Sequence, residues 1–561
     1  MSTSRIVLSL AALALLPCPG LWAQERPPAS RSSEDGSDVD ATSPRIVNII
    51  NFVRRCEPRI EWITEDVLYS TVVEQIACMK RHRLTGTFLL QYDALMDARY
   101  QKLLEDLAAE GFEIGAWWEI PQPLVEDSGF KWRGRYPWDW HADIGFSTGY
   151  SPKEREKLAD TYMAAFKKVF GHYPKSVGSW FIDAHTLKYM HDRYGITSSC
   201  NCKDQIGTDG YTLWGGYWNQ GYYPSKKNAY MPAQNAANQI PVPVFRMLGS
   251  DPIHQYDNGL GENHQRVISL EPIYDPGGAN AAWCKWYFDA FVDGEPMDFA
   301  YTQAGQENSF TWKRMGRGFA MQMELIARFR REGKITLQTL GETGRWFKDR
   351  YQVTPATSVT VLNDHSKKKQ KTVWFNSRYY RANLLWDEDT LRFRDIHLFD
   401  ERVASDYLTE RGTSNRCLFH TLPMVDGFRW SSSRTVAGLR LRSLEGSAIV
   451  GGTPTVKSAE GRLTVRWPTR SPAGELIITF DESTLSLSAV GEVKDRWLLE
   501  LTHDKKAKLP FEEIGRQLLS CRFGNAPYFI SATHGVFAKG PASTLRVLPI
   551  DQRVVLDFSR R

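Results

Sequence analysis

Short apolar runs alternate with amphipathic stretches between residues 45 and 355. The runs are rich in branched and aromatic residues and end at glycines or charged residues, as is typical of buried strands, whereas the stretches between them repeat apolar positions at helical spacing. The predicted strands are Ile46–Val53, Gly86–Tyr92, Phe112–Ala116, Ser176–Ile182, Val242–Leu248, Val267–Glu271, Met297–Thr302 and Ile335–Leu340. Strands that alternate with helices predict an α/β barrel of the (β/α)7-8 type over residues 45–355.

The helix that follows Ser151 carries the strongest start signal in the chain. Ser151 is the expected N-cap, Pro152 stands at the first helical position, and Glu154 completes a capping box. We expect this helix to end near Gly171. Two other predicted helices begin at Thr64 and at Asp97, a short one ends at Gly195, and a long one runs from about Thr311 to Glu332.

Beyond Pro355 the pattern changes to short strands separated by turn residues. The predicted strands are 357–362, 372–375, 390–396, 434–442, 462–467, 475–480, 496–502, 517–522, 527–532, 545–548 and 553–558, with one helical turn at 511–515. Residues 356–561 are therefore predicted to form an all-β sandwich region, as one domain or two.

The amino terminus predicts export. Arg5 precedes an apolar run from Ile6 to Leu16, and a plausible cleavage site lies before Gln24, so residues 1–23 read as a signal peptide. Residues 24–44 are poor in apolar residues and are predicted to be a disordered linker. No later apolar run is long enough to span a membrane. We therefore expect no membrane insertion and a periplasmic or extracellular location.

Composition narrows the possible partners. The 70 basic and 65 acidic residues give a net charge of only +5, with no basic stripe, so no nucleic-acid partner is expected. The chain contains 19 tryptophans, and most of them lie between Trp62 and Trp346. An aromatic excess in a secreted protein suggests a carbohydrate substrate, because indole faces pack on sugar rings. The sequence does not indicate the oligomeric state.

Two tryptophans and a carboxylate close the third predicted strand. Trp117, Trp118 and Glu119 follow the strand at its carboxyl end, where parallel barrels carry their active sites. Stacking rings beside a carboxylate suit glycoside chemistry, although core aromatics beside a surface glutamate would leave the same pattern.

This part of the chain resembles the polysaccharide deacetylases. Gly86–Leu90, the helix Leu103–Ala109 and Gly111–Gly115 are similar to the second-strand, helix and third-strand unit of that family, and the glycosidases of family 57 share a related barrel. The segment Tyr173–Trp180 stands where the fourth strand of that barrel would follow. The whole mature chain also resembles secreted bacterial proteins grouped as domains of unknown function 3863 and 3864, which are regarded as glycoside hydrolases.

The chain departs from the deacetylases where that resemblance implies metal ligands. Asn51–Arg54 replaces the aspartate pair of the first strand, and Trp117–Pro121 replaces the two histidines that follow the third. A divalent cation needs about three hard or imidazole ligands. We therefore expect no metal and no other cofactor, and a glycoside hydrolase that uses two carboxylates.

Several acids follow predicted strands and could form that pair. Family 57 places a glutamate nucleophile on the fourth strand and an aspartate acid later, which only partly matches this chain. The catalytic candidates are Glu119, Asp183, Glu271 and Glu307. Each has a structural alternative, and Asp183 in particular could simply cap the next helix. Glu342 after the last strand could bind substrate or a helix amino terminus.

Aromatic and polar residues crowd the loops after the third and fourth strands. Such loops either pack together or line a groove that binds an oligosaccharide. With the strand-end tryptophans and Glu342, the predicted substrate-binding residues are Trp117, Trp118, Trp140, His141, Asp143, Trp180, His185, Trp214, Trp218, Asn219 and Glu342. The alternatives are a deacetylase-like esterase or a polysaccharide lyase on the same barrel, and a glycan-binding protein without catalysis.

Overall fold

The computed structural model describes residues 43–208, 211–419, 421–470, 474–490, 497–541 and 544–559. The predicted signal peptide and nearly all of the predicted linker lie outside these residues. Residues 43–561 form one compact unit. None of its described helices is long and apolar enough to cross a membrane.

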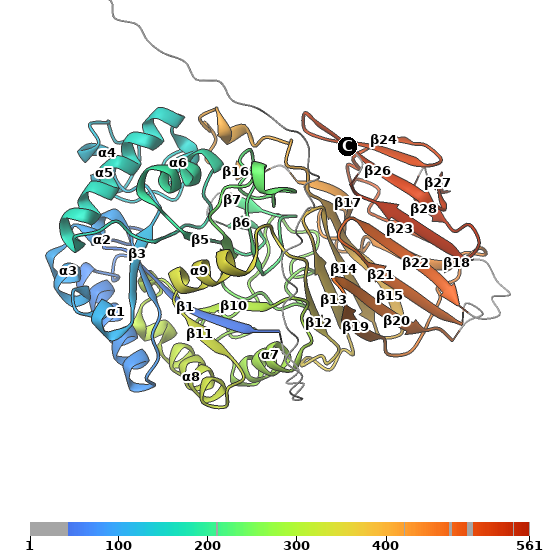
Figure 1. The fold of residues 1–561 in the computed structure, drawn as a ribbon, viewed down its shortest axis with the longest axis horizontal. Coiled ribbons are helices and arrows are strands. Elements are labelled where there is room, and N and C mark those ends of the chain that lie inside the picture. The colour runs from blue at the N-terminus through green and yellow to red at the C-terminus, as the bar shows by residue number, and fades with distance from the viewer. Residues whose placement is uncertain are drawn as a thin grey trace, which may run out of the picture. The chain divides into compact units, whose positions relative to one another are not determined.

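A nearly closed barrel of parallel strands occupies the first part of this unit (Figure 1). Its strands are β1 (Arg45–Val53), β2 (Thr87–Leu90), β3 (Glu113–Trp117), β4 (Ser176–Gly178), β5 (Ser198–Asn201), β9 (Val244–Arg246), β10 (Ala300–Ala304) and β11 (Thr336–Gln338), with the short antiparallel β8 (Gly221–Tyr222) beside β9. The order is β10-β1-β2-β3-β4-β5-β9, and β11 also pairs with β1. At the open seam, Phe245 of β9 and Tyr301 of β10 contact each other at 4.9 Å between ring centroids. The predicted barrel is confirmed.

Helices surround the strands, and most begin at the capping residues that the sequence marks. They are α1 (Glu65–Arg81), α2 (Tyr92–Leu95), α3 (Ala98–Leu104), α4 (Gln122–Asp127), α5 (Pro152–Phe170), α6 (Ala184–Tyr194), α7 (Ala281–Asp293), α8 (Trp312–Arg331) and α9 (Leu340–Arg350). Thr64 caps α1, and Ser151 with Glu154 forms the predicted capping box of α5. These local signals are reliable because a cap satisfies backbone N–H groups within its own segment.

Antiparallel strands make up the second part, as predicted. The first sheet joins β12 (Thr357–Val361), β13 (Lys371–Asn376), β14 (Tyr380–Asp387), β15 (Thr390–Leu398), β17 (Leu422–Asp426), β18 (Gly438–Ser443), β23 (Trp497–Thr502), β27 (Val536–Lys539) and β28 (Leu545–Leu548). The second joins β19 (Thr455–Ala459), β20 (Arg462–Pro468), β21 (Glu475–Phe480), β22 (Thr484–Val490), β24 (Phe511–Ile514), β25 (Leu518–Phe523), β26 (Ala526–His534) and β29 (Arg553–Asp557). Stacked pairs such as Phe375–Phe480, at 5.2 Å, join the two sheets into a sandwich.

Three local predictions are corrected. Phe511–Ile514 forms strand β24, where a helical turn was predicted over residues 511–515. Residues 267–271 form no strand, because only Ser269 makes a single bridge, to Ser250. The last predicted strand shortens to β11, since helix α9 already begins at Leu340.

The first β-sheet is buried on both faces, which explains why β14 escaped prediction. Trp374 of β13 stacks on Trp218 of the barrel part at 4.1 Å, whereas its neighbour Phe375 faces the second sheet. β14 is buried along almost its whole length and carries Arg381 and Asn383 inside. With partners on both faces, it lacks the apolar–polar alternation of a half-buried strand.

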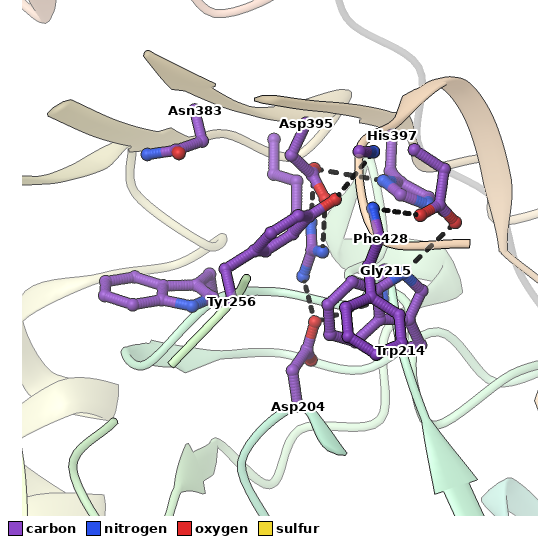
Figure 2. A network of polar contacts seen from close by, with 12 residues as sticks. Asp204, Trp214, Gly215, Tyr256, Asn383, Asp395, His397 and Phe428 are labelled. Atoms are coloured by element: carbon purple, nitrogen blue, oxygen red, sulfur yellow. Dashed lines mark hydrogen bonds and ion pairs between the residues drawn. The ribbon is translucent and has the colours of Figure 1, made fainter. Parts of the chain in front are cut away.

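A buried ion network joins the barrel to this sheet (Figure 2). Arg381 of β14 lies 2.5 Å from Asp204, which follows β5, and 2.8 Å from Asp395 of β15. Asp204 also pairs with Arg246 of β9 at 2.7 Å, and Nδ1 of His397 lies 3.0 Å from Asp395. Figure 2 shows Asp204 on the segment below the network and Asp395 and His397, both of β15, above it.

Replacing Arg381 by Met should lower the free energy of unfolding by about 3–5 kcal/mol. The change leaves Asp204 and Asp395 buried without their shared cation, and breaking a buried ion pair costs about that much. Urea unfolding followed by tryptophan fluorescence measures the loss. As a control, Arg402→Met removes an exposed pair with Asp400 and should cost less than about 1 kcal/mol. Equal small losses in both variants would contradict this role of Arg381.

Candidate active site

A buried arginine lies at the carboxyl end of β1. Arg54 is 1% exposed, and its Nη2 lies 3.2 Å from Glu119 and 2.8 Å from Glu307. The ring of Trp138 covers the guanidinium at 3.9 Å. Glu119 and Glu307 follow β3 and β10, so the parallel strands deliver both carboxylates to the same end of the barrel.

Beside this cluster a cavity of about 370 Å³ opens at the barrel mouth. Its lining includes Arg59, Trp180, Tyr211, Glu271, Tyr274, Glu307, Phe310 and Arg314. Two of the predicted catalytic acids, Glu271 and Glu307, therefore line one cavity. Trp180, one of the predicted substrate-binding tryptophans, also lines it.

Glu271 is held by a buried lysine. Nζ of Lys203, in the segment after β5, lies 2.8 Å from Oε1 of Glu271, and the lysine side chain is 1% exposed. Burial lowers the pKa of Lys203, but Glu271 and Cys202 outweigh burial and raise it. Lys203 therefore stays charged, and its ammonium group forms a buried ion pair with Glu271.

Glu307 lies in the opposite electrostatic environment. Burial raises the pKa of its carboxyl group, and Arg54 and the hydroxyl of Ser309, which donates to Oε1 at 2.5 Å, only partly offset that effect. A carboxyl group with a raised pKa holds a proton to higher pH than an ordinary glutamate. One cavity thus contains one acid whose pKa burial raises and one acid that pairs with a buried lysine.

Gln306 ties the two acids together. Its side-chain amide donates to Oε2 of Glu271 at 3.1 Å, and its Oε1 accepts the backbone N–H of Glu307 at 2.9 Å. Asn51 of β1 accepts the backbone N–H of Gln306 at 3.3 Å. Through Gln306, Asn51 of β1 therefore helps to position the segments that carry Glu271 and Glu307.

Two bulky residues beside the cavity adopt backbone conformations that disfavour them. Leu248, in the lining, has φ = 68°, and Thr311, between the Glu307 loop and α8, has φ = 61°. Positive φ is rare for a leucine and rarer for a β-branched residue, and such strain persists only where the surrounding packing enforces it. Both residues border the loops that carry the paired acids.

The structure corrects the expectation that Trp117 and Trp118 stack on substrate. Both are 0% exposed. Trp117 stacks on Phe52 inside the barrel at 4.2 Å, and Trp118 packs against Tyr162 of α5 at 6.1 Å. Glu119 is also 0% exposed and receives a hydrogen bond from Gln91 at 2.9 Å. Its position supports Arg54 and does not open to the cavity.

Asp183 and Glu342 are helix caps. Asp183 caps α6, pairs with buried Arg155 at 3.0 Å and accepts a hydrogen bond from Ser147. Glu342 belongs to the capping box of α9. The neighbouring Gly341 N–H donates to Glu113, the first residue of β3, so Glu342 lies at the barrel end opposite to the cavity. His185 pairs with Glu156 at the surface between α5 and α6. These contacts give Asp183, Glu342 and His185 structural partners, and their catalytic and binding roles stay predictions.

Three other predicted binding residues lie between the barrel and the first β-sheet. Trp214 donates to Asp426 at 3.1 Å, Trp218 stacks on Trp374, and Asn219 donates to the carbonyl of Ser250. All three are buried. Their aromatic loop joins two parts of the protein, and Trp218 and Asn219 line a small pocket of about 40 Å³ there.

Trp140, His141 and Asp143 lie half-buried in the loop after β3. The guanidinium of Arg59, which lines the cavity, lies 5.2 Å from the ring of Trp140. Trp140 is therefore a neighbour of the cavity rim, and the binding role of this loop stays a prediction.

Sequence analysis overlooked Lys203, Gln306, Tyr274 and Phe310, and it treated Arg54 only as a departure from the deacetylase pattern. Lys203 follows the buried strand β5 by two positions, and a charged residue at such a place could have marked it as a site residue. Among the described residues, no group of three or more His, Cys, Asp and Glu side chains could hold a metal ion.

Comparisons with known proteins add solved structures of low similarity. No family model matches the chain, and no curated protein matches it. The chain is similar to a structure described as a proposed glycoside hydrolase/deacetylase from Parabacteroides distasonis, with 16% identity, a TM-score of 0.48, and coverage of 67% of this chain and 88% of that one. It is also similar to the 4-alpha-glucanotransferase of Thermococcus litoralis, with 8% identity, a TM-score of 0.29, and coverage of 92% and 100%. Membership of the families of unknown function stays a prediction.

Replacing Asp183 by Asn tests its structural role. Burial raises the pKa of Asp183, but Arg155 and the hydrogen bonds outweigh burial and hold the pKa below its usual value. Its stabilisation is therefore present above the unfolded pKa of about 3.9 and is lost as the pH falls through the lower folded pKa. We expect Asp183→Asn to cost about 3 kcal/mol at pH 7, and the deficit to shrink at pH values below about 4.

The matched control for Asp183 is Asp192→Asn on the same helix. Asp192 forms an exposed pair with Lys188, and its loss should cost less than about 0.5 kcal/mol. Thermal and urea unfolding at pH 3 to 7 measure both variants. An Asp183→Asn protein with unchanged stability but abolished turnover would instead support a catalytic role.

Proposed function

We propose that the protein is a glycoside hydrolase whose catalytic acids are Glu307 and Glu271. The observation that carries this proposal is the contrast between the two carboxyl groups in one aromatic-lined cavity: burial raises the pKa of Glu307, whereas Lys203 pairs with Glu271. Paired carboxyl groups in contrasting environments are the arrangement that glycoside hydrolysis requires.

In the proposed reaction Glu307 protonates the departing glycosidic oxygen. Glu271, which pairs with Lys203, attacks the anomeric carbon or activates a water molecule that does so. Gln306 holds the two groups in register. The ring centroids of Tyr274 and Phe310 lie 6.5 Å apart, and both residues are half-buried. Their rings offer apolar surface to the sugar. We further propose that the reaction takes place in the periplasm or outside the cell, as the leader predicts.

Replacing Glu307 or Glu271 by Gln should lower kcat by roughly 100-fold or more, because general acid–base catalysis contributes about that much. Release of reducing ends from a panel of oligosaccharides measures turnover. Glu324→Gln on the exposed face of α8 is the matched control and should leave kcat unchanged. Retained activity in both cavity variants would overturn the assignment. Acetate release that EDTA abolishes would favour the deacetylase alternative.

The pH profile gives a second test. Glu307 must be protonated to act, so kcat/KM should fall as the pH rises through its pKa, which burial holds above the ordinary value of 4.5. Glu271 must be ionised, so activity should also fall on the acid side, giving a bell-shaped profile. In Glu307→Gln the residual activity should lose the basic limb. A basic limb unchanged in that variant would show that another group is the acid.

A further inference from the structure

Two arginines line the cavity from different parts of the chain. Arg59 lies in the loop after β1, and Arg314 lies in the first turn of α8. Arg59 is paired with Glu57 at 2.7 Å. Arg314 is exposed, and no carboxylate of the described residues lies within ion-pair distance of it. Its guanidinium lies 5.7 Å from the ring of Phe310, another lining residue.

When Glu307 is protonated, as its proposed role as the acid requires, the other charges around the cavity balance one another. Arg54 is paired with Glu119 and Glu307, and Lys203 is paired with Glu271. Because Glu307 is neutral when it acts as the acid, the reactive state carries one negative charge fewer. The guanidinium of Arg314 therefore adds net positive charge to a cavity that already holds the reacting acids.

We propose that the substrate is an anionic oligosaccharide and that Arg314 binds the acidic group of its sugar. This inference rests on the proposed function and names its substrate class. A planar guanidinium forms two parallel hydrogen bonds to a carboxylate or a sulfate, and the fixed fork of arginine suits this better than lysine does. The anionic group is the carboxylate of a uronic acid or a sulfate ester, and the ring of the same sugar packs on Phe310.

The test uses the full-length Glu307→Gln variant, which should bind without turnover, on an array of uronate-containing, sulfated and neutral glycans. We expect binding to anionic glycans that weakens at least 10-fold when Arg314→Gln is added and only partly when Arg314→Lys is added. Binding should also weaken as salt rises, since a rim charge is screened. Arg317→Gln, an exposed residue of the same helix outside the cavity lining, is the control and should change nothing.

The outcomes separate this inference from the proposed function. Preference for uronates over sulfated glycans, or the reverse, identifies the acidic group. Binding to neutral glycans alone, no binding to any anionic glycan, or equal binding by the Arg314→Gln variant overturns the anionic preference. If neutral oligosaccharides are still hydrolysed, the hydrolase stands. Cleavage of a uronate to an unsaturated product that absorbs in the ultraviolet would uphold the role of Arg314 and replace hydrolysis by a lyase reaction.

Discussion

The buried ion network around Asp204 is the constraint on which the cavity depends. Asp204 is held by Arg246 from the barrel and by Arg381 from the β-sheet, and it directly follows Lys203. Lys203 in turn pairs with Glu271. The β region therefore fixes the segment whose Lys203 pairs with one proposed catalytic carboxylate. Two charges taken out of water need close partners, so this segment has little freedom to move.

Environment, more than position, distinguishes the acids at the barrel mouth. Glu119, Asp183 and Glu307 all follow strands and all are buried, yet their partners differ. Arg155 and three hydrogen-bond donors hold the charge of Asp183, whereas Glu307 shares Arg54 with Glu119 and has a raised pKa. Arg314 adds a positive charge at the same cavity. Glu307 and Arg314 are the cavity residues on which the proposed proton transfer and the proposed anion binding rest.

Local signals in the sequence were sufficient wherever the hydrogen bonds and apolar positions that define an element lie within its own segment. The helix caps at Thr64 and Ser151 and the barrel strands other than β5 and β8 were predicted, because capping bonds and apolar runs are local. Prediction failed where contacts between residues far apart in the sequence determine whether a segment forms a strand. Residues 267–271 look like a strand but find no strand partner, and β14 lacks alternation because both of its faces are buried. The Trp117–Trp118 pair looked like a binding platform, but its rings complete the core.

The sequence by itself therefore determined the barrel, the following β-sandwich and the presence of acids near strand ends, because periodicity and capping depend on neighbours along the chain. Only the tertiary structure decided which acids share a cavity. Lys203, Gln306 and Arg54 come from different strands and loops, and their contacts with Glu271 and Glu307 follow from how the barrel is assembled. Charge pairing acts through space, so no spacing along the chain could reveal it.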